Sequence, residues 1–203
     1  MLLAGAGAGV ASPVSEPLPA EDAKIVLNDG RVVGANDTVS FSFEGDGPTE
    51  PNSGKGDKSP MACPEVNDKP RYTVKGTPYF MADEDEPQSA WLMPRQTVSW
   101  NVTGSHTFQW DIGGSAEFEA KIILAKAKLS IDTKISNAWT WSGSQVVTDT
   151  NTTSKGYRAV LGQVGWKLTT VKTWIVPPCT AKKKTIVIKT PHKGDMSIGR
   201  QNS

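Results

Sequence analysis

The residues able to carry acid–base or metal chemistry are few and scattered. The chain of 203 residues has two histidines, His106 and His192, and two cysteines, Cys63 and Cys179. Neither histidine lies in a zinc-binding spacing such as HExxH, and no G-x-S-x-G motif or paired-cysteine metal site occurs. Nothing in the sequence selects a catalytic pair among the 21 Asp and Glu residues. We therefore expect a non-enzymatic protein with no catalytic residue, no metal and no cofactor.

The two cysteines are better explained as a structural pair. Residues 1–11, MLLAGAGAGVA, are small and apolar, and Gly9 and Ala11 fit the small-x-small pattern of a signal-peptidase site. Because two cysteines in an exported chain most often pair, we expect a disulfide between Cys63 and Cys179. In the chain-entropy model, closing so long a loop stabilises the fold by ~4–5 kcal/mol. The expected protein is secreted, with residues 1–11 as a signal-peptide remnant.

Charge is unevenly distributed along the chain, although the net charge is only +1. Residues from Lys121 onward carry 14 Lys and Arg against 3 Asp and Glu, whereas residues 1–120 carry 8 and 18. This asymmetry divides the chain into an acidic, turn-rich region, residues 12–95, and a β module with a basic face, residues 96–203. The candidate contact residues of that face are Lys126, Lys128, Lys134, Lys182, Lys183 and Lys184.

The charge split indicates that the acidic and basic halves neutralise each other in part. Any charge left unneutralised is then available to a partner. We expect other protein subunits, in a homo- or hetero-oligomer, and an anionic membrane surface as partners. No nucleic acid is expected, because arginine, the preferred reader of base edges, is scarce.

Alternation of apolar and polar residues predicts an all-β protein. Short strands are expected at Lys24–Leu27, Arg31–Val33 and Thr38–Glu44 within a loop-rich N-terminal segment. Two tryptophan-bearing strands, around Val98–Val102 and His106–Ile112, are expected to form a hairpin at Gly104-Ser105.

The longest alternating segment extends from Ala116 to Ile135. Its apolar face changes side around Ile122–Ala125, which predicts a bulge or a strand that passes from one sheet to another. A helix is the competing interpretation, because AEFEAKIILAKAKL contains good helix formers. The alternation through Ile135 favours the strand. A connection rich in Ser, Thr and Asn, residues 136–156, then leads to a long returning strand over Tyr157–Val176.

Together these segments resemble the elongated β module of aerolysin-like (ETX/MTX2-type) pore-forming proteins. The residues concerned read SAEFEAKIILAKAKLSIDTKISNAWTWSGS, then QVVTDTNTTSKG, then YRAVLGQVGWKLTTVKTWIVPPC. The resemblance implies an elongated antiparallel β-sheet or β-sandwich with long twisted strands. It also implies an amphipathic hairpin that joins an oligomeric barrel, with Ala127, Leu129, Ile131, Thr133, Ile135, Trp139 and Trp141 as its candidate residues.

Three functions follow as expectations. The first is a secreted toxin subunit that oligomerises and inserts the hairpin of Ser130–Gly156 into a membrane. The second is a non-enzymatic adaptor or scaffold in a secreted bacterial multi-protein toxin particle, which binds partner chains through strand edges. The third is a secreted lectin-like module, suggested by seven tryptophans between Trp91 and Trp174, most of which we expect in the core or at interfaces.

Overall fold

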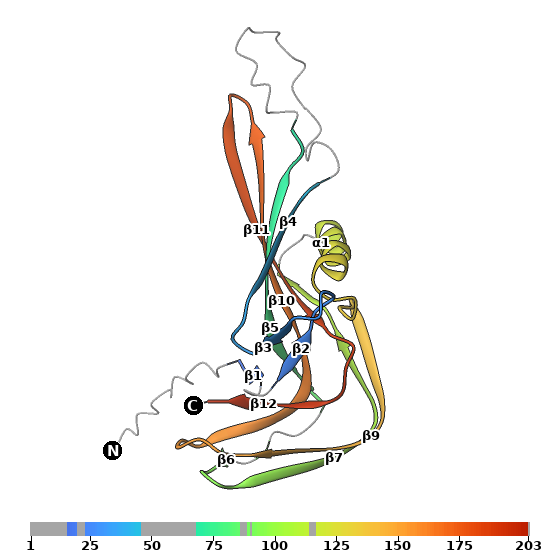
Figure 1. Ribbon diagram of the computed structural model, residues 1–203, viewed down its shortest axis with the longest axis vertical. Coiled ribbons are helices and arrows are strands. Elements are labelled where there is room, and N and C mark those ends of the chain that lie inside the picture. The colour runs from blue at the N-terminus through green and yellow to red at the C-terminus, as the bar shows by residue number, and fades with distance from the viewer. Residues whose placement is uncertain are drawn as a thin grey trace, which may run out of the picture.

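The computed structural model describes residues 16–19, 23–45, 68–85, 89, 91–113 and 117–202. These residues form an all-β protein of antiparallel strands with one helix, extended along one axis (Figure 1). In chain order the elements are β1 Leu18–Pro19, β2 Lys24–Val26, β3 Val32–Gly34, β4 Val39–Glu44, β5 Arg71–Ala82, β6 Trp91–Leu92, β7 Thr97–Gln109, β8 Asp111–Gly113, α1 Glu117–Ser130, β9 Ala138–Thr150, β10 Tyr157–Val176, β11 Thr180–Pro191 and β12 Ser197–Gln201. The expected all-β class is confirmed.

Strand β10 organises the main sheet. Its 20 residues pair with β6 and β5 along one edge and with β12 and β11 along the other. Strand β4 extends the sheet beyond β5, β8 beyond β11, and β1 beyond β12. The returning strand expected over Tyr157–Val176 is confirmed, and strands from the acidic front of the chain pair with strands from its basic end.

Two glycines lie where β10 exchanges β12 for β11 as its neighbour. Gly162 stands opposite Ser197 of β12, and Gly165 stands opposite Pro191 of β11. A Cβ on Gly162 would collide with the carbonyl oxygen of Met81, and one on Gly165 with a carbonyl oxygen of β11. Because backbone atoms cannot yield as the end of a side chain can, both positions require glycine.

We expect Gly162→Ala to lower the free energy of unfolding by about 1–3 kcal/mol, the usual cost of overpacking. Urea unfolding followed by tryptophan fluorescence measures this change. The matched control is Gly113→Ala, whose Cβ would lie at an ordinary 3.7 Å from the Val187 carbonyl oxygen. Equal unfolding free energies for the two variants would contradict the close approach at Gly162.

The region 116–135 departs most from expectation. It forms helix α1 over Glu117–Ser130 and then a turn, so the predicted face-switching strand is wrong. Glu117 and Glu119 in the first turn and Lys128 in the last complement the helix dipole. The residues buried against the sheet follow the helical period: Ala120, Ile123, Leu124 and Ala127. The apparent change of face arises because apolar residues that recur with the 3.6-residue period of a helix cannot stay in phase with the two-residue period of a strand.

The hairpin expected at Gly104-Ser105 is also wrong. Strand β7 continues through this point and pairs with β9 along all 13 of its residues. The segment 136–156, expected as a connection, therefore supplies a long strand. Gly104 and Gly143 face each other in mid-ribbon with φ of 95° and 154°. Such positive φ values suit glycine. Figure 1 shows β7 and β9 curving without a reversal.

The short N-terminal strands are confirmed. Strands β2, β3 and β4 match the expected segments to within a residue. Strands β2 and β3 pair with each other, and β4 pairs with β5. The loop-rich front of the chain therefore contributes β1 and β4 to edges of the main sheet.

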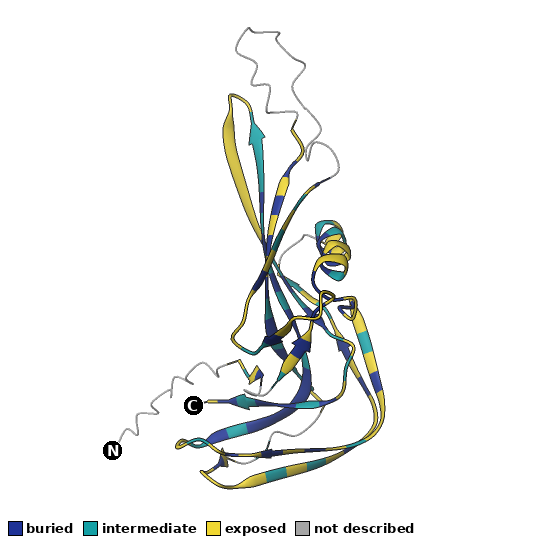
Figure 2. Ribbon diagram, in the orientation of Figure 1, coloured by how far each residue is buried: buried dark blue, intermediate teal, exposed yellow. Residues whose placement is uncertain are grey.

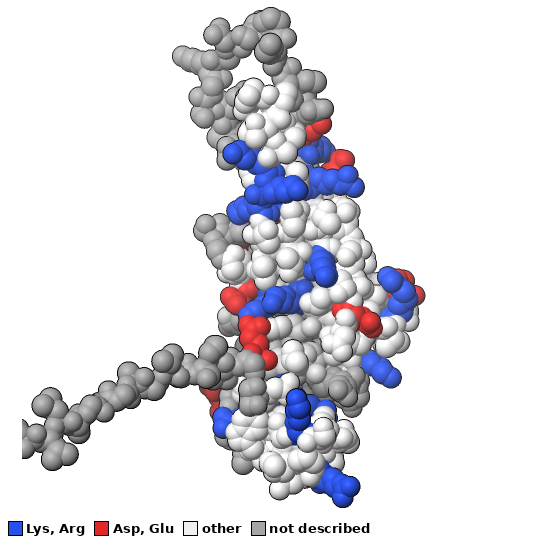
Figure 3. Space-filling view, turned by 90° about the vertical axis from the view of Figure 1, so that its left-hand side faces the viewer, with Lys and Arg blue, Asp and Glu red and all other residues white. Residues whose placement is uncertain are grey.

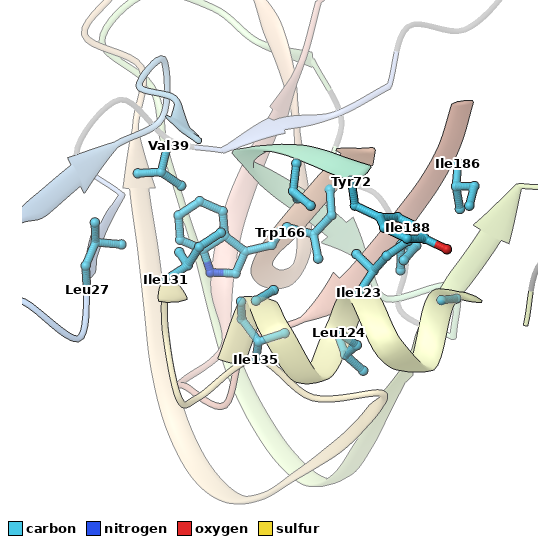
Figure 4. Close-up of a cluster of buried hydrophobic side chains, with 14 of the residues drawn as sticks. Leu27, Val39, Tyr72, Ile123, Leu124, Ile131, Ile135, Trp166, Ile186 and Ile188 are labelled. Atoms are coloured by element: carbon cyan, nitrogen blue, oxygen red, sulfur yellow. The ribbon is translucent and has the colours of Figure 1, made fainter. Parts of the chain in front are cut away.

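Two hydrophobic clusters stabilise the fold. The first lies between α1 and the sheet, around the fully buried Trp166, with Ile131 and Ile135 from the turn after the helix (Figure 4). The second lies beneath β7 and β9. Six of the seven tryptophans are buried or half-buried and Trp91 is 43% exposed, which confirms that most belong to the core or to interfaces. Within the described ranges, no helix has the length and apolarity needed to cross a bilayer.

Candidate functional site

The seven residues expected on the amphipathic hairpin do not share a strand. Ala127 and Leu129 lie on α1, Trp139 and Trp141 lie on β9, and the turn between contains Ile131, Thr133 and Ile135. Ala127, Ile131 and Ile135 belong to the first hydrophobic cluster. The amphipathic strand predicted over Ala127–Ile135 is wrong, because these side chains hold the helix and its turn against the sheet.

The six lysines proposed as a basic face are also separated. Lys126 and Lys128 lie on α1, Lys134 lies in the turn after it, and Lys182–Lys184 lie on β11. Because successive strand residues point to opposite sides, Lys183 faces away from Lys182 and Lys184. The prediction that the six lysines form one contact face is therefore wrong.

Two sequence predictions fall outside the described residues. Cys179 lies in the turn between β10 and β11, but Cys63 is not among the described residues, so their disulfide stays a prediction. Residues 1–11 are likewise outside, and the signal-peptide interpretation stays an expectation.

The feature best suited to a functional role is the two-stranded sheet of β7 and β9, here the β7–β9 ribbon. On its outer face, hydroxyl side chains stand opposite one another. We call these five cross-strand pairs the hydroxyl ladder, and each pair a rung. The pairs are Thr97 with Thr150, Ser99 with Thr148, Thr103 with Ser144, Ser105 with Ser142 and Thr107 with Thr140. The oxygen–oxygen distances in the first, second and fifth rungs are 2.9, 3.1 and 3.0 Å. The ladder therefore satisfies many of its own hydrogen bonds.

The inner face of the ribbon is largely apolar. It covers the lower part of β10 and β12, where the second cluster comprises Leu92, Val102, Phe108, Trp141, Val147, Tyr157, Ala159, Leu161, Met196 and Ile198. Burial accordingly alternates along both strands (Figure 2). Each strand of the ribbon is thus amphipathic along a length of 13 residues.

Buried polar contacts anchor the inner face to the body. His106 Nδ1 lies 2.6 Å from Asp83 Oδ2, and both side chains are less than 10% exposed. Near the other end, Asp149 accepts hydrogen bonds from the Tyr157 hydroxyl and from Arg200, each at 2.7 Å. Burial and the bond to Asp149 raise the pKa of Tyr157, so its hydroxyl remains a donor.

Between these contacts, a side-chain amide ties β9 to the residue that precedes β12. The Gln145 side chain donates to the Met196 carbonyl at 3.2 Å and accepts from the Met196 N–H at 3.1 Å. No strand among the described residues pairs with the outer edge of either β7 or β9. The ribbon is therefore held through its face, while its edges keep unused backbone donors and acceptors.

Helix α1, which lies between β8 and β9 in the chain, is tied to the sheet by an ionic group here called the Glu119 triad. Glu119 Oε1 lies 2.5 Å from Lys172 Nζ of β10, and Oε2 lies 2.7 Å from Lys184 Nζ of β11. The Lys172 side chain is only 4% exposed, and its Nζ also lies 5.2 Å from the Trp174 ring centroid. Burial acts to raise the pKa of Glu119, but the two lysine hydrogen bonds outweigh it and hold that pKa below 4.5.

The lowered pKa of Glu119 gives a signed pH dependence. The stabilisation from the triad is fully present above the ordinary glutamate pKa of 4.5 and is lost as the pH falls through the lowered native value. The difference in unfolding free energy between wild type and Glu119→Gln should therefore be constant above pH 4.5 and should shrink as the pH falls through the lowered native pKa. Urea unfolding at a series of pH values measures it. A difference that stays constant into strong acid would contradict the triad.

The turn after α1 is fixed by a second buried histidine–aspartate pair. His192 Nε2 lies 2.9 Å from Asp132 Oδ2, and the Trp166 indole N–H donates to the same oxygen at 3.3 Å. Burial acts to raise the pKa of Asp132. Its hydrogen bonds, of which the one with His192 has the largest effect, outweigh burial and lower that pKa below its ordinary value. Both histidines of the chain thus serve as structural ties. Within the described residues, no three His, Cys, Asp or Glu are placed to hold a metal.

A sequence signal for the ribbon exists but was assigned to other elements. Hydroxyl residues recur at alternate positions in Thr97–Thr107 and in Thr140–Thr150. The pairing of these segments was missed because β8, α1 and a turn intervene. No family model, curated protein or solved structure matches this chain.

Proposed function

We propose that this protein is a secreted, membrane-active β protein of aerolysin-like type, and that the β7–β9 ribbon is the part that enters the bilayer. The observation that supports this most directly is the alternation of the hydroxyl ladder with apolar residues along both strands. A transmembrane β-strand needs ~9–11 residues with lipid-facing apolar groups alternating with polar ones. Each ribbon strand has 13 residues, which is sufficient.

Insertion requires an oligomer. Backbone groups at an open sheet edge cannot remain unpaired in lipid, so only a closed barrel is tolerated there. The ribbon has two edges that no described strand covers. Ribbons of neighbouring copies pairing edge to edge would close such a barrel, with the hydroxyl ladder facing the lumen and Trp100 and Val102 facing lipid.

The contacts described above define what must break first. The ribbon must leave the second hydrophobic cluster, the Asp83–His106 pair and the Asp149–Arg200 pair. Its connecting segment must also leave the sheet, because β8 pairs with β11 and the Glu119 triad ties α1 to β10 and β11. The starting state is thus a stored form, stable until these contacts are released.

Dye release from liposomes of mixed neutral and anionic lipid tests the proposal. We expect concentration-dependent leakage, together with an oligomer that resists SDS and is recovered in the membrane fraction. If neither leakage nor an SDS-resistant oligomer forms at any concentration, from neutral pH to acid, the proposal is wrong.

The unpaired ribbon edges also favour a second function, a non-lytic adaptor that binds partner chains by β-strand addition. In that case the ribbon stays seated while an edge acquires a partner. Hydrogen exchange separates the two functions: an adaptor gains protection only along the outer edge of β7 or β9, whereas insertion also exposes the amides of β12 beneath the ribbon.

A further inference from the structure

The side of the main sheet opposite helix α1 carries a group of cations that the proposed function does not use. Because alternate residues of a strand share a side, the sheet register places these residues together. They are Arg71 and Lys75 of β5, Lys167 of β10, and Lys183 and Lys189 of β11, here the basic sheet face. Figure 3 shows Lys and Arg gathered along this part of the molecule.

The cations are arranged in rows across the strands. In the first row Arg71 and Lys183 flank Thr173, and in the last Lys167 stands directly opposite Lys189. Lys75 lies between these rows, opposite Thr169. From Thr173 to Lys167 the rows span about 20 Å at ~3.4 Å per residue. The face is thus a line of positive charge along the strands.

Within the described residues, this charge is neutralised mainly at the end of the face that holds Lys167 and Lys189. Glu16 binds Lys189 at 2.7 Å and also acts on Lys167, and Asp111 of β8 stands opposite Lys189. Glu44 stands opposite Arg71 in the register without an ion pair. No ion pair within the described part of the chain involves Lys75 or Lys183, and both are exposed. Like charges directly opposite each other, as at Lys167 and Lys189, destabilise a sheet, and the Glu16 carboxylate, which acts on both lysines, offsets that repulsion. The cations of this face left without a carboxylate partner among the described residues are therefore Lys75 and Lys183.

The side chains between the cations are mostly hydroxyls. Thr73, Thr169, Thr173 and Thr185 lie on the same side of the sheet and offer hydrogen-bond donors and acceptors between the charges. The one aromatic ring among the cations, Tyr79, is covered by Lys189, whose Nζ lies 4.9 Å from the ring centroid. Among the described residues, the face therefore has no free ring on which a nucleic-acid base could stack.

We propose that the basic sheet face binds a linear acidic polysaccharide, with sulfate or carboxylate groups on the cations and sugar hydroxyls on the threonines. A sheet twists along its strands, and Figure 1 shows this part of the molecule twisted. A flexible chain can follow a twisted face, whereas a planar bilayer touches only a short part of it. The site is separate from the β7–β9 ribbon and supplies attachment to an anionic glycan.

Heparin is the probe that tests this site. The variant is Arg71→Gln/Lys75→Gln/Lys183→Gln, and the control, with the same change of charge on the helix side, is Lys126→Gln/Lys128→Gln/Lys182→Gln. By titration calorimetry in 0.1 M salt, we expect binding at least tenfold weaker for the first variant and within twofold of wild type for the control. Neutral dextran of the same size should not bind.

Three results would overturn the proposal. The first is that wild type does not bind heparin, and the second is that both variants lose heparin binding equally. The third is that the first variant loses more binding to phosphatidylserine vesicles or single-stranded DNA than to heparin. Dye release from glycan-free liposomes should be the same for the first variant and wild type, because the basic sheet face lies outside the ribbon. Failure at this site is thus distinguishable from failure of the proposed membrane activity.

Discussion

Replacing Trp100 with lysine should abolish dye release while the protein remains folded. Trp100 lies on the apolar face of β7, half-buried against the second cluster, opposite Val147 of β9. In the proposed barrel this position faces lipid, where a lysine costs about 2–4 kcal/mol at the bilayer midplane and about 0–1 kcal/mol near the interfaces. Every copy in the oligomer carries the change, so leakage should fall far more than tenfold.

The neighbouring position supplies the matched control. Asn101 lies on the outer face of the same strand, opposite Val146, and would face the lumen. We expect Asn101→Lys to retain leakage near the wild-type level. Thermal unfolding must show both variants folded at the assay temperature, because Trp100→Lys also loses packing in the stored form. If both folded variants leak equally, the ribbon is not the inserting element.

Replacing Glu119 with glutamine should have the largest effect on stability. It leaves the Lys172 ammonium buried without its carboxylate, and breaking a buried pair in this way costs about 3–5 kcal/mol. The double variant Glu119→Met/Lys172→Met should recover most of that loss, because a pair of apolar side chains often replaces a buried ion pair at little cost. Urea unfolding of the single and double variants measures the coupling.

The control is Glu117→Gln, two residues earlier on the same helix. Glu117 forms an exposed pair with Lys121 at 2.8 Å, and such pairs add little to stability. We expect no measurable change in unfolding. Because α1 must leave the sheet before the proposed insertion, Glu119→Gln should also accelerate dye release, whereas Glu117→Gln should not. Equal stability of the two single variants would show that the Glu119 triad does not hold the helix.

The sequence and the structure agree at several strands. Strands β2, β3 and β4 follow from alternation, because one face of each meets solvent and the other meets the core. Burial also alternates in the second half of β10, whereas its first half is buried on both faces. The helix was misassigned because small residues such as Ala120 and Ala127 satisfy either period. Its Glu and Lys residues were the better guide, since they favour helix and complement its dipole.

Local sequence alone determined the all-β class, the long strand β10 and the positions where hydroxyl and apolar residues alternate. These properties depend on neighbours along the chain, which the sequence displays directly. Only the tertiary structure decided that β7 pairs with β9, that Glu119 meets Lys172, and that cations of β5, β10 and β11 share one side. Such contacts join residues tens of positions apart, and their free energy depends on burial and register that no local pattern records.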